Sequence, residues 1–92
     1  MSKQRYRGLT NCLRKYRKIR GLKQLQVARL LGLKSTAMIS RWEKGESFPD
    51  WENLLKLAAI YRTMIDALYI DHMRLIRADV LSKEALVQAN KN

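Results

Sequence analysis

Two short helices joined by a tight turn are predicted for residues 24–45, whose sequence is QLQVARLLGLKSTAMISRWEKG. Before the turn, apolar residues recur at intervals of three and four, which is the spacing of one face of a helix. The predicted inward face of this first helix consists of Leu25, Val27, Ala28, Leu30 and Leu31. Gly32 then ends the helix, because glycine adopts the left-handed conformation at a helix C-terminus without steric cost.

The second predicted helix, at about residues 36–44, has one apolar and one polar face. Ser35 is a favourable N-cap for it. Its inward stripe consists of Met38, Ile39 and Trp42, which are spaced as one helical face. Met38 is interpreted either as part of the core or as the edge of the interface. The outward face carries Thr36, Ala37, Ser40, Arg41 and Lys44. Because these side chains are small, hydroxylic or cationic and include no acid, the face suits the groove of a nucleic acid.

These residues resemble the helix-turn-helix family of phage repressors and Cro. The positions that carry the resemblance are Arg17, Gln24, Ala28, Gly32, Ile39, Ser40, Arg41, Glu43, Gly45, Pro49 and the run 54–57. The resemblance covers roughly residues 13–69 and implies an all-α fold, a five-helix repressor-like DNA-binding domain, here with an additional C-terminal helix or helical extension. Two features depart from the family pattern: the turn has one extra residue, placed at Lys34, and Lys23 replaces the usual Ser or Thr cap.

The resemblance also assigns roles to individual residues. It places Thr36, Ala37 and Arg41 where the family reads base edges. A guanidinium binds guanine O6 and N7 in the major groove, and small methyl groups contact the thymine methyl; the alternative for Arg41 is a phosphate contact alone. Phosphate contacts are expected from Gln24, Lys34, Ser35, Ser40 and Lys44. Arg17 and Glu43 are expected to form a structural ion pair, because a free carboxylate beside this helix would repel phosphate.

The positive charge is concentrated in the first half of the chain. Residues 1–42 contain twelve Lys or Arg and no acid, residues 43–92 contain seven against eight acids, and the formal net charge is +11. Such a patch attracts nucleic acid through phosphate neutralisation and counterion release. It also attracts an anionic membrane, but no apolar run approaches the ~20 residues of a span, and no apolar secretion segment follows the N-terminus. We therefore expect double-stranded DNA as the partner, no membrane, and a cytoplasmic location.

The content of cysteine and histidine argues against disulfide, metal and catalytic chemistry. Cys12 is the only cysteine and His72 the only histidine, so the chain has neither an internal disulfide nor the ligands of a zinc site. The sequence contains no glycine-rich phosphate loop and no nucleophile-plus-base constellation. We expect no enzymatic activity, no cofactor and no metal.

Three segments are predicted along the 92 residues, which suffice for one small helical domain. They are a basic N-terminal arm at 1–9, the helix-turn-helix domain at 10–69, and a C-terminal helical extension and tail at 70–92. The basic residues of the arm are Lys3, Arg5 and Arg7. The arm is interpreted either as a disordered tail or as a segment that contacts phosphates or the adjacent minor groove.

Helices are also predicted on both sides of the central pair. A first helix runs to Arg20 and is capped by Thr10 or Asn11. Its inward residues would be Leu13, Tyr16 and Ile19. Asp50 caps a helix from Trp51 to about Tyr61, and a fifth helix begins near Ile65 after Arg62, which stands where the family has a small turn residue. The inward residues of the helix after Asp50 would be Leu54, Leu57, Ala58 and Tyr61.

From residue 69 onward, apolar residues recur at helical spacing, which predicts a sixth helix or an extension of the fifth. They are Tyr69, Met73, Ile76 and Val80. Their apolar stripe must be covered. One alternative is that the segment folds back on its own domain. The other is that it pairs with its twin in a two-fold homodimer, which would match a palindromic operator.

The sequence therefore favours a sequence-specific transcriptional regulator, a repressor that occupies an operator and blocks polymerase. One alternative is the antitoxin of a toxin–antitoxin pair, which would bind its toxin through the tail and regulate its own promoter. Another is an RNA-binding module, although the chain lacks an obvious aromatic platform for stacking bases, since Trp42 lies on an inward stripe. A protein-interaction domain that has lost its nucleic acid is the last alternative.

Overall fold

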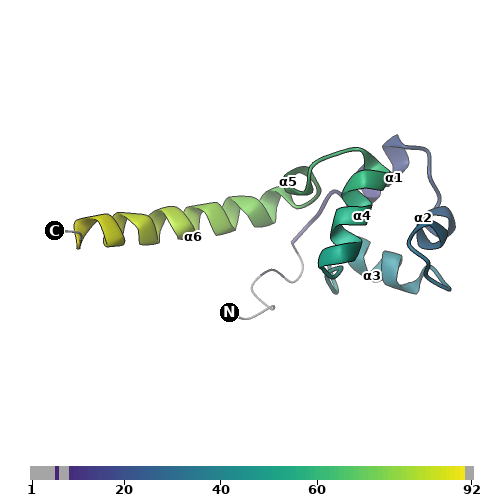
Figure 1. The fold of residues 1–92 in the computed structure, drawn as a ribbon, viewed down its shortest axis with the longest axis horizontal. Helices are drawn as coiled ribbons and strands as arrows, with labels where there is room; N and C mark the ends of the chain where they lie inside the picture. The colour runs from purple at the N-terminus through teal and green to yellow at the C-terminus, as the bar shows by residue number, and fades with distance from the viewer. Residues whose placement is uncertain (1–5, 7–8, 91–92) are drawn as a thin grey trace.

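The computed structural model describes residue 6 and residues 9–90, and this part of the chain is all-helical. The helices are α1 (Leu13–Ile19), α2 (Gln24–Leu30), α3 (Ala37–Lys44), α4 (Trp51–Tyr61), α5 (Ile65–Leu68) and α6 (Ile70–Ala89). The first five form a bundle, and α6 projects away from it, which gives the molecule extents of 54 × 25 × 20 Å (Figure 1). The predicted all-α fold with an additional C-terminal helix is confirmed. None of the described helices is both long and apolar enough to cross a membrane.

Helix α6 does not fold back on the domain, so that alternative is wrong. Residues 74–78 and 80–90 are exposed, and the helix runs without interruption from Ile70 to Ala89. No glycine or proline between these residues turns the chain. The apolar stripe predicted from Tyr69 onward therefore packs on the domain only at its start. Further along, where α6 projects from the domain, the stripe is exposed to solvent (Figure 1).

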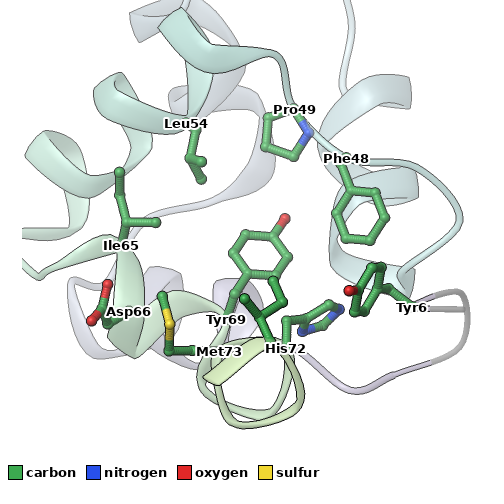
Figure 2. A pocket seen from close by; sticks show the side chains of 10 residues that line it. Tyr6, Phe48, Pro49, Leu54, Ile65, Asp66, Tyr69, His72 and Met73 are labelled. Atoms are coloured by element: carbon green, nitrogen blue, oxygen red, sulfur yellow. The ribbon is translucent and has the colours of Figure 1, made fainter. Parts of the chain in front are cut away.

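An aromatic cluster holds the base of α6 against the loop before α4. The imidazole of His72 meets the ring of Tyr69 edge-on at 4.9 Å between centroids and that of Phe48 at 5.6 Å (Figure 2). The ring of Tyr6 lies 6.1 Å from the imidazole of His72, measured between centroids. His72 is buried in this cluster, so the first turn of α6 is part of the folded domain.

Acidification from pH 7 to pH 5 is expected to destabilise the protein through His72. Burial lowers the pKa of His72 below its ordinary value of 6.5, and the nearby Asp71 offsets this only in part. The unfolded chain then binds the proton at higher pH than the folded one. The stability that neutral His72 contributes is full above about pH 6.5 and is lost as the pH falls through the folded pKa. Urea unfolding at pH 5, 6 and 7 measures this.

The matched variant is His72→Phe, which keeps an aromatic ring in the cluster. Because the sequence contains no other histidine, its unfolding free energy should change far less between pH 7 and pH 5. An equally steep loss of stability in wild type and variant would show that His72 is not the group responsible.

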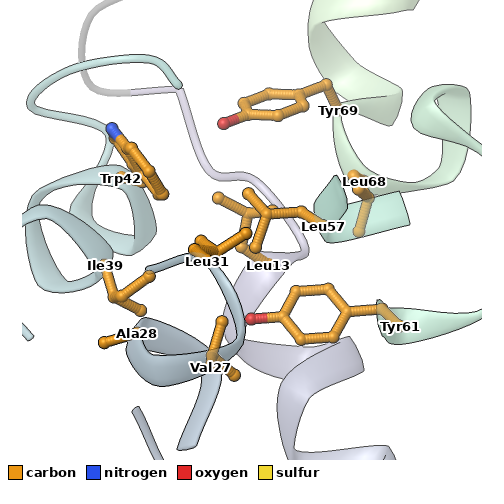
Figure 3. Packing of buried hydrophobic residues seen from close by; sticks show 10 residues of the cluster. All are labelled: Leu13, Val27, Ala28, Leu31, Ile39, Trp42, Leu57, Tyr61, Leu68 and Tyr69. Carbon is orange, nitrogen blue, oxygen red and sulfur yellow. The ribbon is translucent and has the colours of Figure 1, made fainter. Parts of the chain in front are cut away.

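The core lies between α1, α2, α3, α4 and α5. Its buried apolar side chains are Leu13, Val27, Ala28, Leu31, Ile39, Trp42, Leu57, Tyr61, Leu68 and Tyr69 (Figure 3). Trp42 is the largest fully buried side chain, at 2% exposure, as the inward stripe of the second predicted helix requires. Since α3 supplies Trp42 and Ile39 to this core, its opposite face is turned to solvent.

The predicted inward faces of α1 and α2 are partly wrong. Ile19 is 66% exposed, because the buried face of α1 carries Leu13 and Arg17 and is turned away from Ile19. Leu25 and Leu30 are also exposed, and the buried face of α2 and its end is Val27, Ala28 and Leu31. With helices of only seven residues, one turn of apolar residues fits more than one face, and contacts with distant segments decide which face is buried.

The residues predicted to end α2 and α3 and to cap α4 have these roles in the structure. Gly32 and Gly45 both have a φ of 76°, the left-handed conformation expected of a glycine stop. Asp50 caps α4 as predicted, since its Oδ1 accepts a hydrogen bond of 2.9 Å from the backbone N–H of Asn53. Arg62 ends α4 with a φ of 55°, a conformation that costs a residue with a Cβ roughly 1 kcal/mol.

Arg62→Gly is expected to raise the free energy of unfolding by about 0.5 kcal/mol. Glycine removes the steric cost of the left-handed turn, and the greater freedom of the unfolded chain offsets part of that gain. The Arg62 side chain is exposed, so little packing is lost. Urea unfolding measures the change, with Arg62→Ala as the control, which should stay near wild type because it keeps the Cβ. A glycine variant less stable than the alanine variant would contradict this account.

Candidate nucleic-acid interface

Helix α3 begins at Ala37, one residue later than predicted, and Thr36 rather than Ser35 is its N-cap. Thr36 has φ −86° and ψ 0°, which is already close to helical, and its own side chain makes no capping bond. Ser35 Oγ instead accepts a 3.3 Å hydrogen bond from the backbone N–H of Ala37. The longer turn at residues 31–36 thus moves the helix start while the serine hydroxyl still satisfies its first free N–H.

The solvent face of α3 carries the residues that the sequence assigns to base edges and phosphates. Ala37, Arg41 and Lys44 are exposed, whereas Ser40 and Thr36 are half-buried. The Nη1 of Arg41 lies 3.9 Å from the sulfur of Met38. Arg41 and Lys44 are one helical turn apart, so both cations project from the same side.

Of the two places predicted for Met38, the core and the edge of the interface, the structure shows the second. It is 37% exposed and lies beside Arg41 on the outer surface. The sequence contained a signal for this position, because Met38 and Arg41 are three residues apart and therefore share one side of a helix. Met38 joins the candidate interface as an apolar neighbour of the guanidinium.

A buried ion pair fixes α3 against α1. Arg17 Nε lies 2.6 Å from Glu43 Oε2, and Arg17 Nη2 donates to Glu43 Oε1 at 3.0 Å, which makes the pair bidentate. The side chains of Arg17 and Glu43 are only 10% and 6% exposed. The hydrogen bond that Arg17 donates to the Glu43 carboxylate raises the pKa of Arg17 despite its burial. The first acid in the sequence is thus turned away from solvent and neutralised.

Gln24 completes this cluster at the start of α2. Its Nε2 donates a 3.1 Å hydrogen bond to Glu43 Oε1, the oxygen that also accepts from Arg17. The side-chain amide predicted at a phosphate is therefore directed at Glu43, and one of its N–H groups is used there. The phosphate contact of Gln24 stays a prediction, which the remaining N–H of the amide and the backbone at the start of α2 would have to supply.

Two further polar residues, Asn11 and Arg20, hold the helices around α3 through contacts that the sequence did not indicate. Asn11 Nδ2 donates to the backbone carbonyl of Trp42 at 2.8 Å, and its Oδ1 accepts from the N–H of Leu13 at 3.0 Å. The predicted capping role of Asn11 is thus present in its hydrogen bond, although the N-cap position itself falls on Cys12. Arg20 Nε donates to the carbonyl of Ile60 near the end of α4 at 3.1 Å.

The remaining predicted contacts lie around the turn and the N-terminus. Lys34 and Ser35 are exposed in the turn that leads into α3. Lys3, Arg5 and Arg7 lie outside the described residues. Within residue 6 and residues 9–90, no group of three or more His, Cys, Asp or Glu side chains is placed to hold a metal ion.

One comparison with known proteins gave a match. The sequence profile described as helix-turn-helix matches residues 13–68, which run from the first residue of α1 to the last residue of α5. No match was found among curated proteins or among solved structures. The matched segment covers more than half of the chain and leaves α6 outside.

Proposed function

Because the chain belongs to the helix-turn-helix family of phage repressors and Cro, we propose that it is a repressor that occupies an operator and blocks polymerase. Membership supports the coarser statement directly: this is a sequence-specific DNA-binding regulator of transcription. The repressor role adds the simplest mechanism for a small DNA-binding domain, in which occupancy of the site itself excludes the polymerase.

The single observation that carries the proposal is that α3 is anchored in the domain with its cationic face exposed to solvent. Trp42 and Ile39 anchor one side in the core, and the Arg17–Glu43 pair fixes the other, so the solvent face is held rigidly. That face carries Arg41 and Lys44 and no solvent-facing acid, since the Glu43 carboxylate is buried. A rigid, cationic helix of this width fits the major groove of B-DNA.

Within this interface, Arg41 is proposed to read a guanine through O6 and N7. Ala37 at the first position of α3 and Thr36 at its N-cap are proposed to contact base edges, where their methyl groups suit the methyl of thymine. The contacts proposed to phosphates come from Gln24, Lys34, Ser35, Ser40 and Lys44, and arm contacts from Lys3, Arg5 and Arg7. These phosphate contacts would supply most of the affinity and its salt dependence.

We further propose that residues 70–92 form the dimerisation segment. Two copies related by a two-fold axis would place two α3 helices on successive major grooves of a palindromic operator. The support is the exposed apolar surface of α6, which the domain itself leaves uncovered.

Selection of bound sequences from a random duplex library at moderate salt tests the function. The expected pool contains a two-fold symmetric motif, and its half-site spacing gives the distance between the two α3 helices. An unenriched pool, with binding that only fades as salt rises, would contradict sequence-specific reading and favour a general polyanion or RNA binder. Competition between duplex DNA and RNA at matched salt then separates those two.

A further inference from the structure

An apolar groove runs along the base of α6. It has a volume of about 300 Å³ and is lined by Tyr6 and by side chains from the loop before α4, from α4, from α5 and from the start of α6 (Figure 2). Its apolar walls are Phe48, Pro49, Leu54, Ile65, Met73 and Ile76. Met73 and Ile76 line the groove and also belong to the α6 stripe, so the groove adjoins the projecting part of the helix.

The apolar stripe continues along α6 beyond the groove. Val80 and Val87 follow Ile76 at intervals of four and seven and lie on the same side of the helix. They are 46% and 63% exposed. A helix of 20 residues is about 30 Å long, so this stripe reaches well past the domain. The groove and the stripe are therefore continuous, and within residue 6 and residues 9–90 no other segment covers them.

The charges of α6 indicate what covers the groove and the stripe. Between residues 70 and 89, three acids and three Lys or Arg balance, whereas the whole chain has a net charge of +11. Asp71 pairs with Arg74 at 3.6 Å and Asp79 with Lys83 at 3.1 Å. Among the described residues, Arg77 and Glu84 are then the charged side chains of α6 without an ion pair, and they have opposite signs.

Arg77 and Glu84 are complementary when two copies of α6 run antiparallel. An antiparallel alignment that sets Arg77 opposite the partner's Glu84 sets Glu84 opposite the partner's Arg77, because the pairing is two-fold symmetric. The same alignment places the partner's Val87 opposite residue 74, level with Met73 and Ile76 at the groove. One register thus satisfies both free charges and brings an exposed apolar side chain to each groove.

We infer that the groove of each copy is filled by the distal half of α6 from a second copy, in an antiparallel exchange. The partner's Val87 enters beside Met73 and Ile76, and two Arg77–Glu84 pairs flank the contact. This inference rests on the dimer of the proposed function and names its interface, but it requires no DNA.

The test is sedimentation equilibrium of the protein without DNA at several concentrations up to about 50 μM, because association depends on concentration by mass action. Wild type is expected to dimerise. Arg77→Glu should weaken the dimer about tenfold, because two pairs become like-charged, and Arg77→Glu/Glu84→Arg should restore it. Val87→Asp should weaken it about 100-fold, because each copy would bring a charge into an apolar groove. Arg62→Glu, the same charge change outside α6, is the control.

Two results would overturn the inference: a wild-type monomer throughout this range, or a dimer whose affinity is the same in wild type, the single swap and the double swap. Arg77, Glu84 and Val87 are exposed, and circular dichroism verifies that the variants fold. The outcome is separable from that of the proposed function. A monomeric protein that still selects a specific half-site would retain DNA reading and lose only this interface.

Discussion

Replacement of Glu43 by Leu is expected to lower the free energy of unfolding by about 3–5 kcal/mol, because it leaves the guanidinium of Arg17 buried without its counter-charge. Both side chains of the pair are nearly inaccessible to solvent, so water cannot take over the lost hydrogen bonds. A domain of 92 residues has a total stability of roughly 5–14 kcal/mol, so the single variant loses about a fifth of it or more. Urea unfolding followed by far-UV circular dichroism measures the loss.

The double variant Arg17→Met/Glu43→Leu is the matched control. Replacement of both charges by apolar groups of similar volume is often close to neutral, so the double variant should be more stable than Glu43→Leu alone. This order would show that the pair orients α3 without supplying much net stability. A Glu43→Leu variant that loses less than about 1 kcal/mol, or a double variant that is no more stable than Glu43→Leu, would contradict a buried, coupled pair.

Arg41→Ala is expected to weaken binding to the selected operator by about 1–3 kcal/mol per α3 helix and to remove the preference at one base pair of each half-site. The side chain is exposed on a face that the core holds fixed, so its loss should leave folding unchanged. Titration against the selected duplex, and against duplexes altered at each position, measures both effects.

Lys44→Ala is the comparison for Arg41→Ala. It removes a cation from the same face of α3, but as a proposed phosphate contact it should weaken binding to all duplexes about equally and reduce the salt slope by about 1 per copy. If Arg41→Ala behaved in the same way and kept the wild-type base preferences, Arg41 would be a phosphate contact, which is the alternative left open by the sequence.

The sequence predicted those parts of the fold that depend on local chemistry. Gly32 and Gly45 end their helices in the left-handed conformation, and Asp50 caps α4 through its carboxylate. Each of these signals acts within a few residues, so periodicity and turn chemistry were sufficient. The resemblance to the family supplied the Arg17–Glu43 pair, which joins residues 26 positions apart and which no local pattern indicates.

The errors arose where distant contacts decide between local alternatives. Either the face of α1 with Ile19 or the face with Arg17 could turn inward, and the face with Arg17 is buried because Glu43 meets it there. The sequence left Met38 open between the core and the edge of the interface, and it lies at the edge because Ile39 and Trp42 already fill the space beneath α3. The direction of α6 was open for the same reason, since its stripe suits either its own domain or a second copy.

The residues of the candidate site could be predicted from the sequence, but the way in which they are arranged in space could not. The exposed positions of Ala37, Arg41 and Lys44 follow from the helical period once Trp42 is placed inside. The hydrogen bond from Gln24 to Glu43 did not follow, because the start of α2 and the end of α3 are brought together only by the turn between them. That turn carries the extra residue, so its effect on the start of α3 required the structure.

The central claim is that α3 reads bases in the major groove through Arg41, and methylation interference at guanine N7 tests it most directly. N7 lies in the major groove and is one of the two atoms that a guanidinium contacts on guanine. On the selected duplex, methylation of one guanine in each half-site should abolish binding of wild type, and Arg41→Ala should be indifferent to that same methylation. Wild-type binding that is indifferent to methylation at every guanine of the motif would contradict the claim.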